Sequence, residues 1–405
     1  MNQVGNTAGD GHLAQAREAG LAMALAVTGT AQGLATFAVY SLPVLVALAA
    51  PDFGLPIAMI GYQVALLYVF AALSSGFGGP LLRRVGPVRT TQIALLCAAL
   101  GVEMLALAHW IWALPASALL GAAYGLTNPA AAQLLGRLAP ASRRNLVFSV
   151  KQMGVPLGLA LAGLVLPPLA QSIGWQMAML AGAAVLTLLA VGVQPLRAGW
   201  DRPQAEAGGA PAATFAWRDA PALRLLAITG ASFGVVQIAL GAHMMAMLVL
   251  DFGWDLVSAG LLVALCQTVG AFSRIGWAVL ADGWSSGLKV LGLIGVLTAA
   301  FLLLLPLAPS AGVLLIGLLF ALLGGTAAGW NGVLVAESVR LAPPGAAGAA
   351  SGAVLSLTFV GAVVGPTAIA LMSTALGGYV WAFALSAALP LIGGAVALRA
   401  RRLVG

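Results

Sequence analysis

The sequence predicts an all-α membrane protein in which twelve transmembrane helices form two pseudo-symmetric six-helix bundles. Of the 405 residues, 61% are hydrophobic and only 7% are charged, whereas soluble domains carry about 25% charged residues. Apolar stretches long enough to cross a bilayer recur along the whole chain. In addition, two short motifs of the first half reappear in the second half. Together these observations favour a duplicated, multi-pass membrane protein.

Twelve apolar stretches define the expected helices, because each is about as long as a helix that crosses a bilayer. They cover residues 20–49, 56–80, 90–110, 114–137, 145–169, 175–195, 222–250, 256–281, 289–308, 312–338, 347–373 and 378–398.

The domain division follows from the segments between and around these helices. Residues 196–221 are polar and rich in Pro and Ala, so we expect a flexible cytoplasmic linker there. It would join a first bundle, residues 20–195, to a second bundle, residues 222–398. The polar residues 1–19 and the basic residues 399–405 are expected to be cytoplasmic tails.

Positive charge is confined to one side of the expected membrane. The loops on the opposite side contain Asp52, Asp251 and Asp255 but no Lys or Arg. Because Lys and Arg concentrate in cytoplasmic loops, both termini are expected in the cytoplasm of a bacterial-type inner membrane. The residues on the same side as Arg17 are Arg83, Arg84, Arg89, Arg137, Arg143, Arg144, Arg197, Arg202, Arg218, Arg224, Lys289, Arg340, Arg399, Arg401 and Arg402.

Several function classes are excluded by the sequence. The net charge of +7 is explained by membrane orientation, so a nucleic-acid partner is not expected. The chain has no phosphate-binding loop of the P-loop type. Its three His and two Cys share no metal-ligand spacing. We therefore expect neither an enzyme nor a cofactor, and we expect a monomer in the lipid bilayer that binds a small molecule.

The two halves share motifs at matching positions. Asp52-Phe53-Gly54 follows helix 1, and Asp251-Phe252-Gly253 follows helix 7. Asn128, followed nine residues later by Arg137-Leu138-Ala139-Pro140, recurs as Asn331 followed by Arg340-Leu341-Ala342-Pro343 with the same spacing. Two repeated six-helix bundles imply a pseudo-twofold axis along the membrane normal, with a binding site between the bundles.

The loop between helices 2 and 3, GPLLRRVGPVR, resembles the signature G-x-L-x-D-R-x-G-x-R of the major facilitator superfamily. Gly79, Arg84, Gly86 and Arg89 match, while Arg83 replaces the aspartate. In the second half GWAVLADG resembles the same signature and keeps the acid, Asp282. The resemblance covers nearly the whole chain. It implies alternating access, with a cytoplasmic lock in the outward-open state that includes Arg84, Arg89 and Asp282.

A second resemblance concerns the cargo. Arg274 lies eight residues before Asp282, like the helix-8 arginine of monocarboxylate and oxalate-type carriers, which binds substrate carboxylate. The run SVKQMGVPLG on helix 5 resembles a group of bacterial facilitators. These resemblances imply a secondary active transporter of a small organic anion, such as a mono- or dicarboxylate. The alternatives are a proton-coupled exporter of drugs or other metabolites, in which Arg274 is structural, and a non-transporting receptor on the same fold.

Arg274 and Lys151 are the main candidates for substrate binding. A charged side chain within a helix that crosses the membrane is costly, so it usually faces a protein interior or a cavity. The superfamily fold packs helix 5 against helix 8, which would bring the two cations together, and an anion between them would relieve their repulsion. In the alternative, Lys151 reaches the cytoplasmic surface and Arg274 pairs with Glu337 or Asp282.

Weaker candidates are polar or aromatic residues within the apolar helices. Each could contact substrate, but each could equally serve in packing or in hydrogen bonds between helices. His243 could titrate during transport, although a hydrogen-bonded histidine near the outer mouth is the simpler interpretation. Glu337, Arg340 and Arg137 resemble cytoplasmic gating clusters of the family. The remaining substrate candidates are Asn128, Asn331, Tyr40, Tyr124, Gln267 and Trp330. Protons are a possible second partner.

Overall fold

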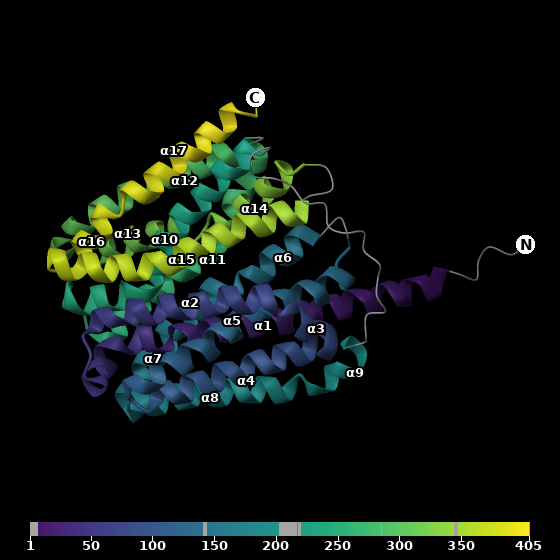
Figure 1. The fold of residues 1–405 in the computed structure, drawn as a ribbon, viewed down its shortest axis with the longest axis horizontal. Helices are drawn as coiled ribbons and strands as arrows, with labels where there is room; N and C mark the ends of the chain where they lie inside the picture. The colour runs from purple at the N-terminus through teal and green to yellow at the C-terminus, as the bar shows by residue number, and fades with distance from the viewer. Residues whose placement is uncertain are drawn as a thin grey trace, which may run out of the picture.

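The computed structural model describes residues 7–140, 144–201, 217, 220–284, 286–343 and 347–404. Within these residues, twelve helical segments are long and apolar enough to cross a membrane. Figure 1 shows them as two groups, one from each half of the chain, that lie side by side. The predicted fold class, an all-α membrane protein with two pseudo-symmetric six-helix bundles, is therefore confirmed.

Helix bounds in the first half show that several expected helices are divided. Its elements are α1 (Thr7–Phe53), η1 (Ile57–Met59), α2 (Ile60–Phe77), α3 (Gly79–Val85), α4 (Pro87–Ala106), η2 (Trp110–Trp112), α5 (Ala113–Leu138), α6 (Arg144–Gln152), α7 (Gly154–Ile173), α8 (Trp175–Gly192), η4 (Gln194–Leu196) and α9 (Arg197–Trp200).

The second half repeats this pattern of long and divided helices. Its elements are α10 (Pro221–Leu250), α11 (Leu256–Gly283), α12 (Gly287–Leu304), η6 (Leu305–Ser310), α13 (Val313–Ala327), α14 (Asn331–Arg340), α15 (Ala347–Leu376), α16 (Tyr379–Leu385) and α17 (Ala388–Arg402).

Helices of the structure extend into segments that the sequence predicted as tails and linker. Helix α1 begins at Thr7, inside the expected tail, because residues 12–19 consist mainly of good helix formers such as Ala, Leu, Gln and Glu. Helix α17 continues to Arg402, where its basic last turn complements the helix dipole. Of the expected linker, the beginning forms η4 and α9, while residues 202–216 and 218–219 lie outside the described residues.

Two transmembrane helices are interrupted within their length. The fifth is interrupted at Met153, between α6 and α7. Pro156 has no N–H, so the helical hydrogen bond to the carbonyl of Gln152, four residues earlier, cannot form. The tenth is interrupted at 328–330, between α13 and α14. Both interruptions leave backbone carbonyls that need other hydrogen-bond donors.

The two bundles touch mainly at the end of the molecule opposite the chain termini. Contacts join α2 to α15, α7 to α11, and α1 to α10. The closest approach of α7 to α11 is made by small residues, because a Cβ atom at Gly163 would lie only 2.8 Å from the carbonyl oxygen of Gly260. Towards the end that carries the termini, the two bundles diverge (Figure 1).

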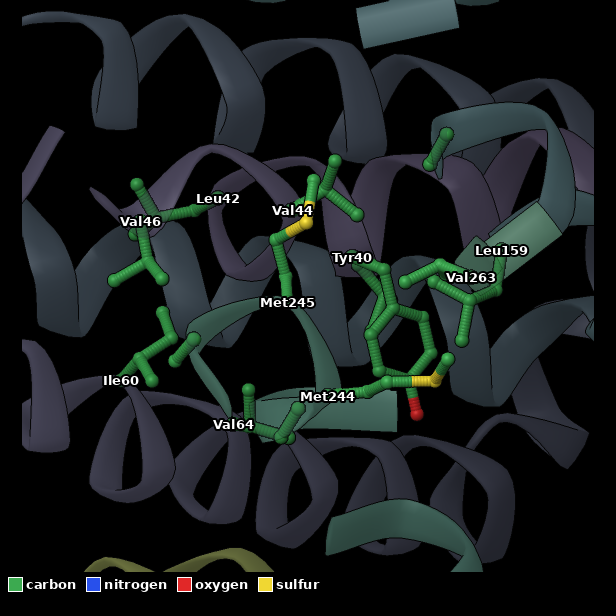
Figure 2. Packing of buried hydrophobic residues seen from close by; sticks show 14 of the residues in the cluster. Tyr40, Leu42, Val44, Val46, Ile60, Val64, Leu159, Met244, Met245 and Val263 are labelled. Carbon is green, nitrogen blue, oxygen red and sulfur yellow. The ribbon is translucent and has the colours of Figure 1, made fainter. Parts of the chain in front are cut away.

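Apolar side chains fill this contact between the bundles. Figure 2 shows Tyr40 and Val44 of α1 and Val64 of α2 packed around Met244 and Met245 of α10. All five side chains are at most 3% exposed. Close packing of this kind drives helix association in lipid, where the hydrophobic effect between helices is weak.

Helix packing inside the first bundle depends on Gly158. A Cβ atom at Gly158 would overlap the carbonyl oxygen of Gly33 on α1, whereas a Cβ atom at Gly29 would meet nothing within 4 Å. We expect Gly158→Ala to destabilise the protein by about 1–3 kcal/mol, the usual cost of overpacking. The matched change Gly29→Ala should be neutral or stabilise by up to about 1 kcal/mol, because it removes a helical glycine. Thermal unfolding in detergent compares them, and equal stability of the two variants would contradict this packing account.

Candidate functional site

Arg274 connects the two bundles near their centre. It lies on α11 and is only 7% exposed. Its Nε donates a hydrogen bond of 3.1 Å to the carbonyl oxygen of Ala328, in the interruption of the tenth transmembrane helix. Its Nη1 donates a bond of 2.9 Å to the carbonyl oxygen of Gln152, in the first bundle. One guanidinium therefore holds carbonyls from both halves.

Helix interruptions supply the acceptors for this guanidinium. The carbonyl of Gln152 is free because Pro156 cannot donate to it. In the second bundle, Trp277 Nε1 donates to the carbonyl of Gly325 at 2.7 Å, and Trp330 Nε1 donates to that of Ala327 at 2.9 Å. Because carbonyl groups are neutral, they satisfy the N–H groups of Arg274 without compensating its charge.

Lys151 lies at the end of α6 and is 2% exposed. Its Nζ donates to Oε1 of Gln32 at 2.8 Å, to Oδ1 of Asn128 at 2.6 Å, and to Oε1 of Gln152 at 3.3 Å. We call these three amides the amide cage. Lys151 thus contacts Asn128, another predicted substrate residue, and it does not reach the surface as the alternative required.

Neither cation forms an ion pair with a carboxylate among the described residues. No salt bridge joins Arg274 or Lys151 to an acid among the side chains that the structure describes. The alternative pairing of Arg274 with Glu337 or Asp282 is therefore wrong for this structure. Asp52, Asp201, Asp251, Asp255 and Glu337 accept hydrogen bonds elsewhere, and Glu18, Glu103 and Asp282 are exposed.

A tyrosine cluster adjoins the cations in the first bundle. The hydroxyl groups of Tyr40 and Tyr68 are 3.2 Å apart. The ring of Tyr124 meets that of Tyr68 edge to face, with centroids 5.5 Å apart, and Tyr124 lies within electrostatic range of Arg274. Tyr40 also packs on Gly241 of α10. Of the predicted residues, Tyr124 thus lies near Arg274, and Tyr40 lies at the contact of the bundles.

Other predicted substrate residues lie apart from this cluster. Asn331 donates to Oε1 of Gln237 at 3.0 Å inside the second bundle. Trp330 packs edge to face on Phe233 and is 1% exposed. His243 has its Nε2 2.9 Å from the carbonyl oxygen of Pro366 and stacks on Tyr379. Gln267 is buried on α11, two turns before Arg274.

The expected gating residues make their contacts within one bundle each. Arg340 Nη2 donates to Oε2 of Glu337 at 2.6 Å, and Oε1 of Glu337 accepts from the backbone N–H of Gly287 at 2.8 Å, at the start of α12. Arg137 donates to the carbonyl oxygen of Trp200 at 3.4 Å. Arg89 donates to Oε1 of Gln92 at 3.2 Å. Arg84 and Asp282 are exposed.

Three functional candidates were missed at the sequence level. Gln32 and Gln152 complete the amide cage, although amides within apolar helices could have drawn attention to them. Asp201 accepts the backbone N–H groups of Val88 at 2.7 Å and Arg89 at 3.0 Å. A carboxylate at this helix N-terminus is favourable, so an acid from the end of α9 supports the loop whose own acid is replaced by Arg83.

Loss of the Asp201 carboxylate should weaken the start of α4. We expect Asp201→Ala to lower stability by about 1–2 kcal/mol, the usual cost of losing a helix-capping side chain. Exposed Glu103 provides the control, since Glu103→Ala should change stability by less than about 0.5 kcal/mol. Unfolding of both variants in detergent tests this, and an Asp201→Ala variant as stable as the parent would show that the cap is dispensable.

Comparisons with known proteins fit this architecture. Similar solved structures include a bacterial homologue of the human lysosomal transporter Spinster, in inward-facing occupied and unoccupied forms, with TM-scores of 0.74 and identities of 15% and 17%. Each covers 94% of this chain and 97% of its own. The nucleoside transporter NupG has a TM-score of 0.74 at 14% identity, covering 93% and 99%. These likenesses show the fold alone.

The curated sequence relatives match a smaller part of the chain than the solved structures do. Uncharacterized MFS-type transporters from two strains of Mycobacterium tuberculosis are 29% identical over 199 residues, which is 47% of this chain and 43% of each relative. The alignment thus spans less than half the length of these curated relatives. The model of the Major Facilitator Superfamily matches residues 21–366, most of the chain. The chain therefore belongs to the Major Facilitator Superfamily of membrane transporters.

Proposed function

We propose that this transporter is a secondary active carrier that moves a small organic anion across the membrane by alternating access. The observation that carries the proposal is the burial of Arg274 and Lys151 with neutral oxygens as their only hydrogen-bond partners among the described residues. Burying one ion costs several kcal/mol. An anion bound beside these cations would lower that cost.

Arg274 is the proposed direct ligand of the anion. A guanidinium has five N–H groups, and the hydrogen bonds to Ala328 and Gln152 use only two of them. The remaining N–H groups suit a carboxylate, which accepts paired hydrogen bonds from arginine with good geometry. Tyr124 and Asn128 flank the same region, so their hydroxyl and amide groups are proposed to orient the cargo.

The conformational cycle follows from where the bundles touch. If the termini are cytoplasmic, as the distribution of Lys and Arg predicts, the contact of Gly163 with Gly260 closes the outer side. The described form is then inward-facing. Rocking of one bundle against the other would open that contact. It would also bring together the cytoplasmic gating residues Arg84, Arg89, Arg137, Asp282, Glu337 and Arg340.

Substitution of Arg274 tests the proposal. A panel of carboxylates would first be screened for thermal stabilisation of the purified protein, because a ligand of the folded state raises its stability. Uptake of the best ligand into proteoliposomes should then fall to background in Arg274→Gln, which lacks the charge. Arg274→Lys should lose at least about tenfold, because lysine cannot bind a carboxylate through two parallel hydrogen bonds.

The control is Arg224→Gln, which removes an exposed arginine from the start of α10. Its uptake should match that of the parent protein at equal expression. Parental uptake by Arg274→Gln would refute the proposed anion site.

A further inference from the structure

We infer that Gln32 sets the charge of the substrate: because an amide and not a carboxylate holds Lys151, the site keeps two positive charges and selects a dianion. This inference rests on the proposed function, in which Arg274 and Lys151 bind an anion. It adds a substrate class, a small dicarboxylate or a comparable dianion, and a residue that determines it.

The geometry of the amide cage suits a charged lysine. Three oxygen atoms, from Gln32, Asn128 and Gln152, lie within 3.3 Å of Nζ. Each oxygen can only accept a hydrogen bond, and an ammonium group has three N–H donors to offer. A neutral amine has two N–H groups and a lone pair, so one oxygen would face that lone pair. The cage therefore fits the cation and carries no charge to balance it.

Gln32 is an unusual choice for this position. Its side chain is fully buried, and its Oε1 accepts hydrogen bonds from both Lys151 at 2.8 Å and Thr127 at 3.0 Å. Its Nε2 is buried without a hydrogen-bond partner among the described residues. A buried donor without a partner is destabilising. Glutamate in this place would keep both accepted bonds, remove the unpaired donor and pair with Lys151.

The amide of Gln32 thus differs from a carboxylate of the same shape in its effect on the charge of Lys151. It positions Lys151 while leaving the lysine charge available to a ligand. Together with Arg274, this gives the region two positive charges, since no described carboxylate contacts either side chain. A ligand with two negative charges balances the site, whereas a monoanion leaves one buried charge uncompensated.

Gln152 shows how the second charge of such a ligand reaches Lys151. The side chain of Gln152 accepts from Lys151 at 3.3 Å, the longest bond of the cage, and its backbone carbonyl accepts from Arg274 at 2.9 Å. Gln152 is partly exposed, whereas Gln32 is fully buried. A ligand carboxylate can therefore replace the Gln152 amide and gain a charge-assisted hydrogen bond. Because Gln152 contacts Lys151 through its side chain and Arg274 through its backbone, we propose that the dianion spans the distance between these two contacts.

The experiment compares ligands that differ by one charge. Succinate and glutarate are paired with their monoamides, and methyl phosphate with dimethyl phosphate, at pH 8 on the purified full-length protein. Titration calorimetry should show at least one dianion that binds at least about tenfold more tightly than its monoanionic partner, as expected for one additional charge pair in a low-dielectric site.

Gln32→Glu then removes the surplus charge at Lys151. Affinity for the dianion should fall at least about tenfold, while affinity for the monoanion changes much less. Without ligand, Gln32→Glu should unfold at the same temperature as the parent or higher, because the unpaired donor is gone. A general loss of folding would lower that temperature. Asn128→Asp places a carboxylate on the same Nζ and provides a second test if Gln32→Glu fails to fold.

Gln237→Glu is the matched control. Gln237 lies on α10 in the second bundle, and its Oε1 accepts from Asn331, so an acid there keeps that hydrogen bond without contacting Lys151. The preference for dianions should persist in this variant. Equal losses in Gln32→Glu and Gln237→Glu, or a parent protein that binds both members of each pair equally, would overturn the inference and leave the proposed function standing. Failure of the parent protein to bind any of these anions would count against the proposed function itself.

Discussion

Moving a charge from water into a bundle of apolar helices costs several kcal/mol unless other groups compensate it. This chain buries two charged side chains, Arg274 and Lys151, and their hydrogen-bond partners among its described residues are all neutral oxygens. The interruptions of the fifth and tenth transmembrane helices follow from that constraint, since an intact helix has no free carbonyl in its middle. Pro156 thereby belongs to the site although it contacts no ligand.

The bond from Arg274 to Gln152 also couples the site to the arrangement of the bundles. Arg274 and Gly260 belong to the same helix, α11, and Gln152 and Gly163 belong to α6 and α7, which form one transmembrane segment. Glycines allow the two backbones to approach closely at one end. In the proposed cycle, separation at the glycines changes the distance between Arg274 and Gln152, so occupancy of the site and the position of the bundles depend on each other.

Sequence reasoning located the helices better than the side chains around the cations. Uniformly apolar stretches reveal where a helix crosses the membrane but not which face points inward, because the usual contrast between polar and apolar faces is missing. The resemblance to a known fold placed the helices of Lys151 and Arg274 against each other, and both side chains do contact Gln152. The role of Gln32 in the amide cage could not be predicted in this way, because it depends on how α1 is rotated about its axis. For the same reason Trp330, a predicted substrate residue, packs inside the second bundle instead. His243 is hydrogen-bonded to Pro366 and lies against Gly61 of α2, at the contact of the two bundles.

The chain uses acids and amides in different places, and the difference explains why an amide surrounds Lys151. Asp201, Asp255 and Glu337 each accept backbone N–H groups at the start of a helix, α4, α11 and α12 respectively. Those positive helix ends are permanent, so a permanent negative charge is favourable there. A carrier that binds and releases an anion needs a positive charge that is not permanently neutralised at its binding site. In the proposed mechanism, an acid bonded to Lys151 would compete with every anion that arrives, whereas the amide of Gln32 holds the ammonium in place and leaves its charge to be balanced by cargo that binds and departs.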